Sequence, residues 1–504
     1  MKRFALLWLV LMPTAYGYHI LCIQSMPMRS HYILMRGIVN ILLEAGHEVT
    51  MTTTYPDIKP VNKLNLIDIS EVRKIIEAID LSDRSQMGSI DVTDVSRNIS
   101  TMVIESSNVR DVIVNKNFDA VVSEWFYSDL EAGYAAVLQV PWIVLSNSMS
   151  PYMEYLVDTV RSIPSIPLTM DKKLPMHFVE RTKNTLEYLT NLYANYLQFV
   201  KTNGDYEKYF KPLAEARNIA LPSLTEAIHN ISILLVNTYP SMEPTKSLPP
   251  NVINIAGYHF GNASQLSKDL QEILDSSKRG VIYFSMGSAL KADVFSDKTR
   301  AKLLQVFESL PYTILWKFDD DLQFLPQNVH IRNWVPQSSV LAHPNIKLFI
   351  THGGLLSTLE AINNGIPMIV IPVYGDQITN AARSVEQGIA KKVTLSPFIA
   401  ENISSALHEM LQDDRYHKRA MVMSTLFRNR PVLPSKLVKY YVELAIETKG
   451  ANHLRSPALL YKWYELWMLD QLAALLLFIF TSYLIFKYFI KYLTRKISGK
   501  SKIQ

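Results

Sequence analysis

The chain has 504 residues, 48% of them hydrophobic, and a formal net charge of +5 at pH 7; because one hydrophobic core rarely supports this length, we expect at least two domains. Six basic residues follow the last acidic residue, Asp470, and two lie in the first three positions. Without those eight the chain has a net charge of −3, which leaves no basic face for nucleic acid and excludes that class of partner.

The amino-terminal segment MKRFALLWLVLMPTAYG predicts a signal peptide over residues 1–17. Lys2 and Arg3 precede an apolar stretch, and the segment ends in the small-x-small pattern of a cleavage site. A transmembrane anchor is the competing interpretation, but the apolar stretch is too short to span a bilayer. The only cysteine, Cys22, follows in an apolar strand pattern, so the fold depends on its core and has no intramolecular disulfide.

The first half of the mature chain has the pattern of a parallel sheet. YHILCI reads as a strand, His31 to Gly46 as an amphipathic helix, and HEVTMTTT as the next strand, and such a unit pairs its strands in parallel. FDAVVSEW and VPWIVLS add two buried strands. The stretch LEYLTNLYANYLQFV predicts helices that flank this sheet. We expect an N-terminal domain over residues 18–245.

The second half repeats this organisation. YPSMEPTKSLPPN (239–251) concentrates proline and polar residues and predicts the passage between domains. GVIYFSMGS, YTILWKF, NVHIRNW, IKLFITHGG and IPMIVIPV then read as strands alternating with helices, which indicates a second doubly wound α/β domain over residues 246–445. In such folds ligands bind at the carboxyl ends of the strands, so we expect the site in a cleft between two facing sheets.

Residues 471–490 predict a single transmembrane helix. QLAALLLFIFTSYLIFKYFI carries one charge, Lys487, and the preceding segment, residues 446–470, contains aromatic residues typical of a membrane interface. The basic tail, residues 491–504, marks the cytoplasmic side, so we expect a type I protein with a lumenal body. Its end, KSKIQ, resembles a dilysine signal for the endoplasmic reticulum, although an ordinary basic tail fits nearly as well. Sequons at Asn98, Asn230, Asn262 and Asn402 fit a lumenal body.

The segment FITHGGLLSTLEA (349–361) joins an apolar strand to a helix through His352-Gly353-Gly354. Part of this pattern is structural, because Ser357 to Glu360 has the S-x-x-E spacing of a capping box and Gly365 ends the helix. The histidine and the paired glycines need another explanation. Glycines let backbone amides approach an anion, and a helix amino end favours negative charge, so the junction suits a diphosphate.

From Trp334 to Gln377 the chain reads WVPQSSVLAHPNIKLFITHGGLLSTLEAINNGIPMIVIPVYGDQ, which resembles the donor-binding signature of the UDP-glycosyltransferases. GVIYFSMGS, SHYILMRGIVNILLEAGHEVT and the carboxyl-terminal span also match the membrane-bound branch of that family, its insect-type members most closely. The resemblance implies a GT-B fold of two Rossmann-like domains facing a cleft and transfer of a hexose from a UDP-sugar. It implies no metal or other cofactor, and no metal-ligand spacing occurs near the signature.

The resemblance also implies contacts for each part of the donor. An aromatic face would hold the base, carboxylates the vicinal hydroxyls, and neutral donors with a helix end the phosphate oxygens. The uridine is assigned to Trp334 for the uracil ring, Gln337 nearby and Glu360 for the ribose. The diphosphate is assigned to Gly287, Ser288, His352, the Gly354 backbone and Ser357. The transferred sugar would donate hydrogen bonds to Asp376 and Gln377. Leu356 departs from the asparagine usual in plant and vertebrate members.

For the general base, the resemblance points to His31 in RSHY, at the amino end of the first helix. From the residues alone, a histidine in a capping turn with Ser30 as the cap is an equal alternative. Positive charge at the helix end disfavours the imidazolium, so we expect a neutral ring that can accept a proton. The carboxylate that orients the ring is assigned to Glu124, where vertebrate members have aspartate, with Asp129 as the alternative.

The implied reaction is a single displacement with inversion at the anomeric carbon. Insect-type relatives generally use UDP-glucose, whereas vertebrate relatives often use UDP-glucuronate held by a basic residue, for which Lys246 is the candidate; glucose is favoured. The N-terminal loops, roughly residues 80–110 and 151–230, predict a small lipophilic acceptor. A UDP-sugar epimerase and a non-catalytic UDP-sugar carrier are the rival functions, and homo-oligomerisation is left open.

Overall fold

The structure is a computed structural model. It describes residues 17–56, 59–79, 91–158, 168, 174–241, 246–260, 265–287, 294–320 and 324–500, and side chains as far as residue 495. Several predicted features therefore lie wholly or partly outside the described residues: signal-peptide residues 1–16, parts of the acceptor loops (80–90, 159–167 and 169–173) and of the interdomain passage (242–245), the sequon at Asn262, the donor contact Ser288 and the last four residues of the basic tail.

Seven described strands form the first sheet in the order β3-β2-β1-β4-β5-β6-β7, and every neighbouring pair is parallel. The strands are β1 (His19–Ile23), β2 (Glu48–Thr53), β3 (Leu64–Asp68), β4 (Ala120–Glu124), β5 (Trp142–Ser146), β6 (Ile231–Val236) and β7 (Val252–Asn254). Two separate apolar clusters cover its two faces. Burial on both faces explains why β5 and β6 are nearly continuous apolar runs, although β6 was not predicted from the sequence.

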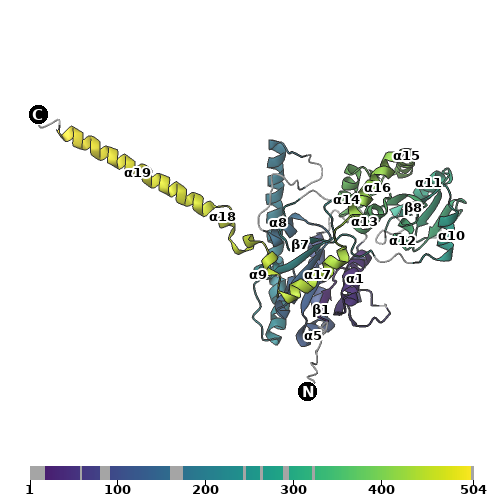
Figure 1. Cartoon of the computed structure of the whole chain (residues 1–504), viewed down its shortest axis with the longest axis horizontal. Helices are drawn as coiled ribbons and strands as arrows, with labels where there is room; N and C mark the ends of the chain where they lie inside the picture. The colour runs from purple at the N-terminus through teal and green to yellow at the C-terminus, as the bar shows by residue number, and fades with distance from the viewer. Residues whose placement is uncertain are drawn as a thin grey trace, which may run out of the picture.

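Helices cover the first sheet on both sides (Figure 1). They are α1 (Arg29–Glu44), η1 (Ser70–Val72), α2 (Arg73–Glu77), α4 (Val92–Glu105), α5 (Ser107–Asn115), α6 (Ala132–Leu138), α7 (Pro151–Val157), α8 (Phe178–Ala216) and α9 (Leu224–Ile228). Together with β1 to β7 they make the first lobe.

Six described strands form the second sheet in the order β10-β9-β8-β11-β12-β13, again with all pairs parallel. The strands are β8 (Val281–Ser285), β9 (Thr313–Lys317), β10 (Val329–Arg332), β11 (Ile346–Thr351), β12 (Met368–Val370) and β13 (Ala390–Lys392). The helices of this second lobe are α10 (Lys268–Ser276), α11 (Asp297–Glu308), α12 (Gln337–Leu341), α13 (Leu355–Asn364), α14 (Gln377–Glu386), α15 (Ile399–Gln412) and α16 (Asp414–Arg428). The two doubly wound α/β lobes predicted from the sequence are thus confirmed.

Two elements that the sequence places in the second domain lie on the first sheet. β7 pairs with β6. α17 (Pro434–Glu447) crosses back from the second lobe, and Val438, Val442 and Ala445 on it are fully buried in the core that also contains α1. An apolar face predicts that a helix is packed, but it does not say against which sheet, so the pattern alone could not locate this return.

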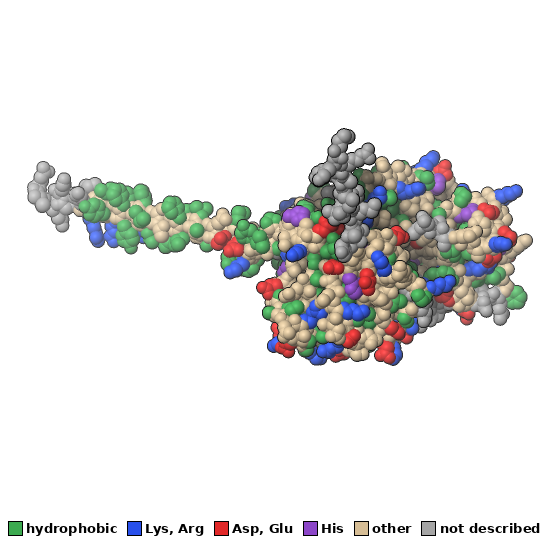
Figure 2. Space-filling view, turned by 60° about the horizontal axis from the view of Figure 1, so that its bottom comes forward, with side chains coloured by type: hydrophobic (Ala, Val, Ile, Leu, Met, Phe, Trp, Pro, Cys, Tyr) green, Lys and Arg blue, Asp and Glu red, His purple; other side chains and the backbone are tan. Residues whose placement is uncertain are grey.

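The carboxyl-terminal segment leaves the first lobe through η3 (Asn452–Leu454), η4 (Pro457–Leu460) and α18 (Trp463–Leu466). α19 (Leu469–Lys500) then extends away from the body (Figure 1). Within the described chain, its segment Leu469–Arg495 is long and apolar enough to cross a membrane, and none of it is buried. Apolar side chains line this helix and basic ones gather toward its far end (Figure 2).

Candidate active site

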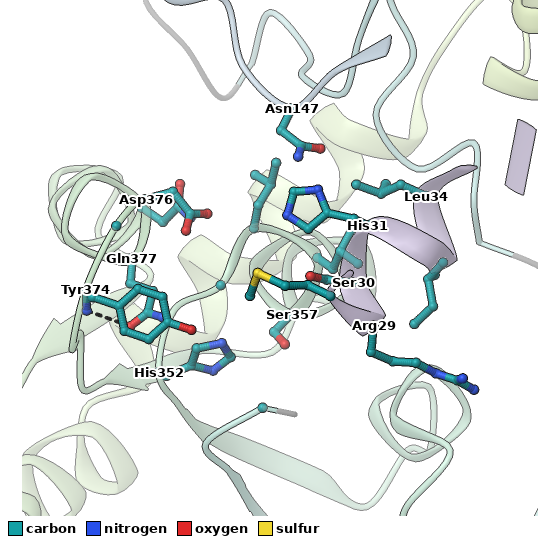
Figure 3. Close-up of a pocket in the computed structure, with 18 of the residues that line it drawn as sticks. Arg29, Ser30, His31, Leu34, Asn147, His352, Ser357, Tyr374, Asp376 and Gln377 are labelled. Atoms are coloured by element: carbon teal, nitrogen blue, oxygen red, sulfur yellow. Dashed lines mark hydrogen bonds between the residues drawn. The ribbon is translucent and has the colours of Figure 1, made fainter. Parts of the chain in front are cut away.

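A cleft of about 1370 Å³ lies between the two lobes and is lined by residues of both. His31 and Asn147 come from the first lobe, and His352, Ser357 and Asp376 come from the second (Figure 3). The carboxyl ends of β1, β4 and β5 lead into the cleft on one side, and those of β8, β9 and β11 on the other. The predicted location at facing carboxyl ends of two parallel sheets is therefore where the large cavity is found.

His31 is the third residue of α1, and its imidazole meets the carboxylate at the end of β4. Its Nδ1 lies 2.6 Å from Oε1 of Glu124, and both side chains are almost fully buried. Phe126 contacts the ring edge-on, with 4.8 Å between ring centroids. The α1 amino end has no side-chain cap, so Ser30 does not cap it and the capping-turn alternative does not hold.

The pKa of His31 is shifted in the opposite direction to the one expected from its place at a helix amino end. Burial lowers the pKa of His31, but the charge of Glu124, the hydrogen bond to Glu124 and the charge of Asp376 outweigh it, and the pKa is raised. His31 is therefore a stronger base than an isolated imidazole. Since Nδ1 faces a carboxylate, Nε2 is the nitrogen that can take a proton from a group in the cleft.

Of the two carboxylates considered as the partner of His31, only Glu124 contacts the ring. Asp129 instead accepts a hydrogen bond from Nε1 of Trp125, at 2.9 Å, and another from the hydroxyl of Tyr152. Its pKa is raised, because burial outweighs these two hydrogen bonds. The side chain of Asp129 thus belongs to a buried network beside the cleft.

Asn147, just after β5, was not predicted from the sequence. Its Nδ2 donates to Oε1 of Glu124 at 3.3 Å, and its side chain lies beside His31 in the cleft. The oxygen that holds His31 is thereby held from a second direction. The only signal in the sequence was its place after a buried strand, which it shares with many polar residues.

Glycine is required at the positions around His352 because a larger residue there would clash with its ring. A Cβ on Gly287 would lie 2.5 Å from the imidazole of His352, and a Cβ on Gly354 would lie 2.6 Å from its Nε2. Gly287 and Gly353 also have φ near +85°, a conformation that residues with side chains rarely adopt. The ring of His352 is therefore enclosed by backbone, with Gly287 on one side and Gly354 at the start of α13.

His352 is uncharged at neutral pH. Burial, and then the charge of Lys317, lower its pKa to about 4. Its Nδ1 is buried and makes no hydrogen bond within the described chain. Lys317 donates to the carbonyl oxygen of Gly287 at 2.7 Å, so a cation supports the same loop. Sequence reasoning missed Lys317, although its position at the end of the strand YTILWKF was a usable signal.

A hydrogen-bonded group connects α12 and α13 next to His352. Nε2 of Gln337 donates to Oγ of Ser357 at 2.9 Å and to Oε2 of Glu360 at 2.6 Å, and Ser338 donates to the other carboxylate oxygen. Burial raises the pKa of Glu360, and the bonds from Ser338 and Gln337 only partly oppose this shift. The predicted capping box is wrong: Gly354 is the N-cap of α13, which has no side-chain cap bond, and Glu360 faces α12. The predicted end at Gly365 is confirmed by its left-handed backbone.

Trp334 lies at the edge of the cleft, with 59% of the residue exposed. Nζ of Lys317 lies 5.5 Å from its ring centroid, and Cζ of Arg29, from the first lobe, lies 5.9 Å from it. Leu356 packs against the apolar core of the first lobe. At that position the chain makes an apolar contact between lobes.

Asp376 and Gln377 lie at the start of α14, across the cleft from His31 (Figure 3). The walls of the cleft desolvate the Asp376 carboxylate and raise its pKa, although Asn380 donates to it at 2.8 Å. The amide oxygen of Gln377 already accepts from the backbone N–H groups of Val373 and Tyr374. Gln377 can therefore only donate to a ligand, which corrects its expected role as an acceptor.

Lys246 does not line the cleft. Its Nζ lies 2.9 Å from Oε1 of Glu154 and donates to the carbonyl oxygen of Met149 at 2.5 Å, and its side chain is 11% exposed. The suggestion that Lys246 receives a carboxylate of the donor is not compatible with this position. Among the described residues, no group of three or more His, Cys, Asp or Glu side chains is arranged to hold a metal ion.

The sequence model of a family described as UDP-glucoronosyl and UDP-glucosyl transferase matches residues 21–504. UDP-glucosyltransferase 2 of Dactylopius coccus is 32% identical over 507 residues, covering 98% of this chain and 97% of that protein. UDP-glucuronosyltransferase 2A3 of Mus musculus is 28% identical, covering 94% and 92%. Among solved structures, the glycotransferase of kitacinnamycin has a TM-score of 0.58 at 18% identity, covering 85% of this chain and 99% of that one. This last similarity shows the two-lobed fold.

Proposed function

The chain belongs to the UDP-glucoronosyl and UDP-glucosyl transferase family, and from this membership we propose that it transfers glucose from UDP-glucose to a hydroxyl group of a small lipophilic acceptor. The observation that carries the proposal is the single cleft in which His31, paired with Glu124, faces the group around His352. An acceptor and a sugar diphosphate can meet there because the first lobe supplies the base and the second lobe supplies the contacts to the diphosphate.

His31 acts as the general base. Its Nε2 takes the proton of the acceptor hydroxyl while Glu124 holds Nδ1–H and stabilises the resulting imidazolium. The acceptor oxygen forms a bond to the anomeric carbon, and the bond from that carbon to the diphosphate breaks on the opposite face. UDP leaves with the electron pair, and the configuration at the anomeric carbon is inverted.

The second lobe binds the donor. Trp334 stacks on uracil, Gln337 and Glu360 contact the uridine, and Asp376 and Gln377 contact the sugar. We assign the diphosphate to Gly287, His352, Gly354 and Ser357, and to Ser288 on the sequence alone. Neutral His352 donates one hydrogen bond to the leaving oxygens, while the amino end of α13 and Lys317 supply positive potential. Glu360 keeps lone pairs for ribose hydroxyls, because each oxygen accepts only one bond from α12.

Glucose is favoured over glucuronate by the surroundings of the sugar site. Lys246, the residue considered for a glucuronate carboxylate, pairs with Glu154, and neither residue lines the cleft. The sugar side presents the carboxyl group of Asp376, whose oxygens accept hydrogen bonds from neutral hydroxyls. A glucuronosyl transfer by the same mechanism is the second candidate, since relatives of both names match more than nine tenths of the chain (98% and 94%).

The acceptor part of the cleft has a mainly apolar wall. Met26, Ile33, Leu34, Val92, Val95 and Phe126 line it from the first lobe. Such a wall binds hydrophobic molecules and positions one hydroxyl near His31. With α19 as the anchor, we place the enzyme as a type I protein of the endoplasmic reticulum membrane with its body in the lumen.

The test uses the full-length protein in detergent with UDP-glucose, UDP-glucuronate and a panel of lipophilic phenols and alcohols. His31→Ala should reduce turnover by about 10²- to 10⁴-fold, as expected for loss of a general base, while UDP binding measured by calorimetry stays unchanged. Retained activity in that variant would remove His31 as the base. Interconversion of UDP-sugars without an acceptor would indicate an epimerase, and UDP binding without any product a carrier.

A further inference from the structure

The long helix α8 is apolar on two opposite faces. Its carboxyl-terminal half buries Tyr206, Phe210 and Leu213 in the core of the first lobe. On the opposite side of its amino-terminal half, eight large apolar side chains are 45–74% exposed: Phe178, Val179, Leu186, Leu189, Tyr193, Tyr196, Leu197 and Val200. We refer to these eight as the outer stripe. A helix on the surface of a soluble domain normally has one apolar face, so the second face needs an explanation.

The outer stripe is continuous and carries no charge. Its positions recur at intervals of three, four and seven residues, which places them within about 100° of the helix surface. Over residues 178–200 the stripe is about 33 Å long at 1.5 Å per residue. The charged residues of the same segment, such as Lys183 and Glu187, lie at other angles. Patches of this extent on soluble proteins mark a surface that meets a membrane or another protein.

We propose that the outer stripe lies in the interfacial layer of the membrane that α19 crosses. α8 borders the first lobe on the side from which α18 and α19 leave (Figure 1). Tyr461, Trp463 and Trp467, just before α19, are also exposed and are typical of the membrane surface. Because α19 keeps the body next to the bilayer, docking of α8 is an intramolecular event with a small entropic cost.

The composition of the stripe favours a bilayer over a second copy of the chain. Leucine, valine and phenylalanine suit the acyl boundary, and the phenol groups of Tyr193 and Tyr196 suit the headgroup region. Leu186, Leu189 and Tyr193 also have the spacing of a coiled-coil seam. The positions that flank such a seam are Thr185, Thr190, Leu192 and Leu197, so the alternating charges that pair two helices are missing from this sequence.

Docking has a consequence for the cleft, and this consequence rests on the proposed transfer to a lipophilic acceptor. Nε2 of Gln198 on α8 donates to Asp91 at 3.1 Å, and Lys201 pairs with Asp94 at 3.1 Å. Asp91 and Val92, at the start of α4, line the acceptor part of the cleft. A helix fixed in the interface therefore holds the acceptor part near the bilayer, where lipophilic acceptors concentrate.

The docking is tested with single cysteines in the full-length protein. Cys22 is buried and its thiol pKa is raised by that burial, so it gives no background labelling. Leu189→Cys and Tyr193→Cys carry a bimane label on the outer stripe, and Ala194→Cys carries it on an exposed neighbouring face of the same helix. Each protein is placed, one chain per nanodisc, in phosphatidylcholine containing a nitroxide-labelled lipid.

The lipid nitroxide should quench bimane at residues 189 and 193 at least threefold more than at residue 194, and aqueous iodide should show the reverse order. UDP binding within twofold of the unsubstituted protein controls for folding. As a second variant, Leu189→Glu with Tyr193→Glu should abolish lipid quenching of a label at Leu186→Cys while UDP binding is retained. Equal lipid quenching at all positions overturns the proposal. In liposomes with many chains, an inter-chain disulfide through Tyr193→Cys without lipid quenching also overturns it, in favour of a second copy.

Discussion

Replacing Glu124 with glutamine tests how the first lobe makes its base. In the proposed mechanism the imidazolium of His31 forms against the Glu124 carboxylate, and Nδ1 lies 2.6 Å from Oε1. At an effective dielectric constant of about 20, unit charges about 4 Å apart attract by about 4 kcal/mol. Glutamine can keep a hydrogen bond worth about 1 kcal/mol. About 3 kcal/mol of imidazolium stabilisation is lost, which corresponds to a rate loss of about 10²-fold.

The same change should move the pH profile, and the sign follows from the pKa of His31. The base must be neutral, so kcat/KM falls as pH falls through that pKa, which Glu124 and Asp376 hold above its ordinary value of 6.5. In Glu124→Gln the carboxylate charge that raises the pKa of His31 is lost, so burial lowers this pKa further. The acidic limb of the profile should therefore move to lower pH while the plateau drops.

The assay is the pH dependence of kcat/KM with UDP-glucose and one acceptor over pH 5 to 9. Asp129→Asn is the matched control: it also neutralises a buried carboxylate near the cleft, but that carboxylate contacts Trp125 and Tyr152. The control should leave the acidic limb where it is. A Glu124→Gln enzyme with an unshifted limb, or with a plateau within threefold of the original, would refute the reasoning.

Three further substitutions probe the second lobe and the donor preference. Gly354→Ala puts a Cβ 2.6 Å from His352 and should weaken UDP binding at least tenfold by calorimetry, whereas Gly204→Ala, which has open space and an ordinary φ, should not change it. Trp334→Ala should raise KM for the UDP-sugar by about 5- to 150-fold through the loss of about 1–3 kcal/mol of stacking, with an unchanged melting temperature because the residue is largely exposed. Lys246→Ala should leave the ratio of UDP-glucose to UDP-glucuronate turnover unchanged, because Lys246 faces Glu154; a ratio altered more than threefold would return Lys246 to the donor site.

Strand patterns predicted most of both sheets, because parallel strands buried on both faces are mainly apolar. They missed β6, which lies in a stretch predicted to be helical, and the short or partly exposed strands β3, β7 and β13. The assignment of elements to lobes was less predictable. Val438 and Val442 on α17 show an apolar face, but the sheet that receives this face depends on how the chain returns after α16. Both lobes offer apolar sheet faces on which α17 could pack, and no local sequence pattern distinguishes them.

Local rules were also incomplete within the site. The S-x-x-E spacing of Ser357 and Glu360 satisfies a capping box, yet both side chains bond to Gln337 of another helix. The capping rule considers one helix alone, whereas the polar groups of α12 lie close enough to compete. Gln377 shows the same effect, since its amide oxygen is occupied by the turn before α14. The sequence can thus predict which residue lies at a site without predicting which of its atoms is free to contact a ligand.

His31 shows how magnitudes decide between two valid rules. A helix amino end acts on a nearby charge with about 0.3–1 kcal/mol in exposed positions and up to about 2 kcal/mol when partly buried. A carboxylate in direct contact with the ring, with both side chains buried, contributes several times more. The sequence identifies the helix end at once, but Glu124 lies 93 residues away and meets His31 only because β4 pairs with β1 in parallel. The stronger effect is the non-local one, so the protonation behaviour of the base follows from the pairing of two strands and not from the helix on which it lies.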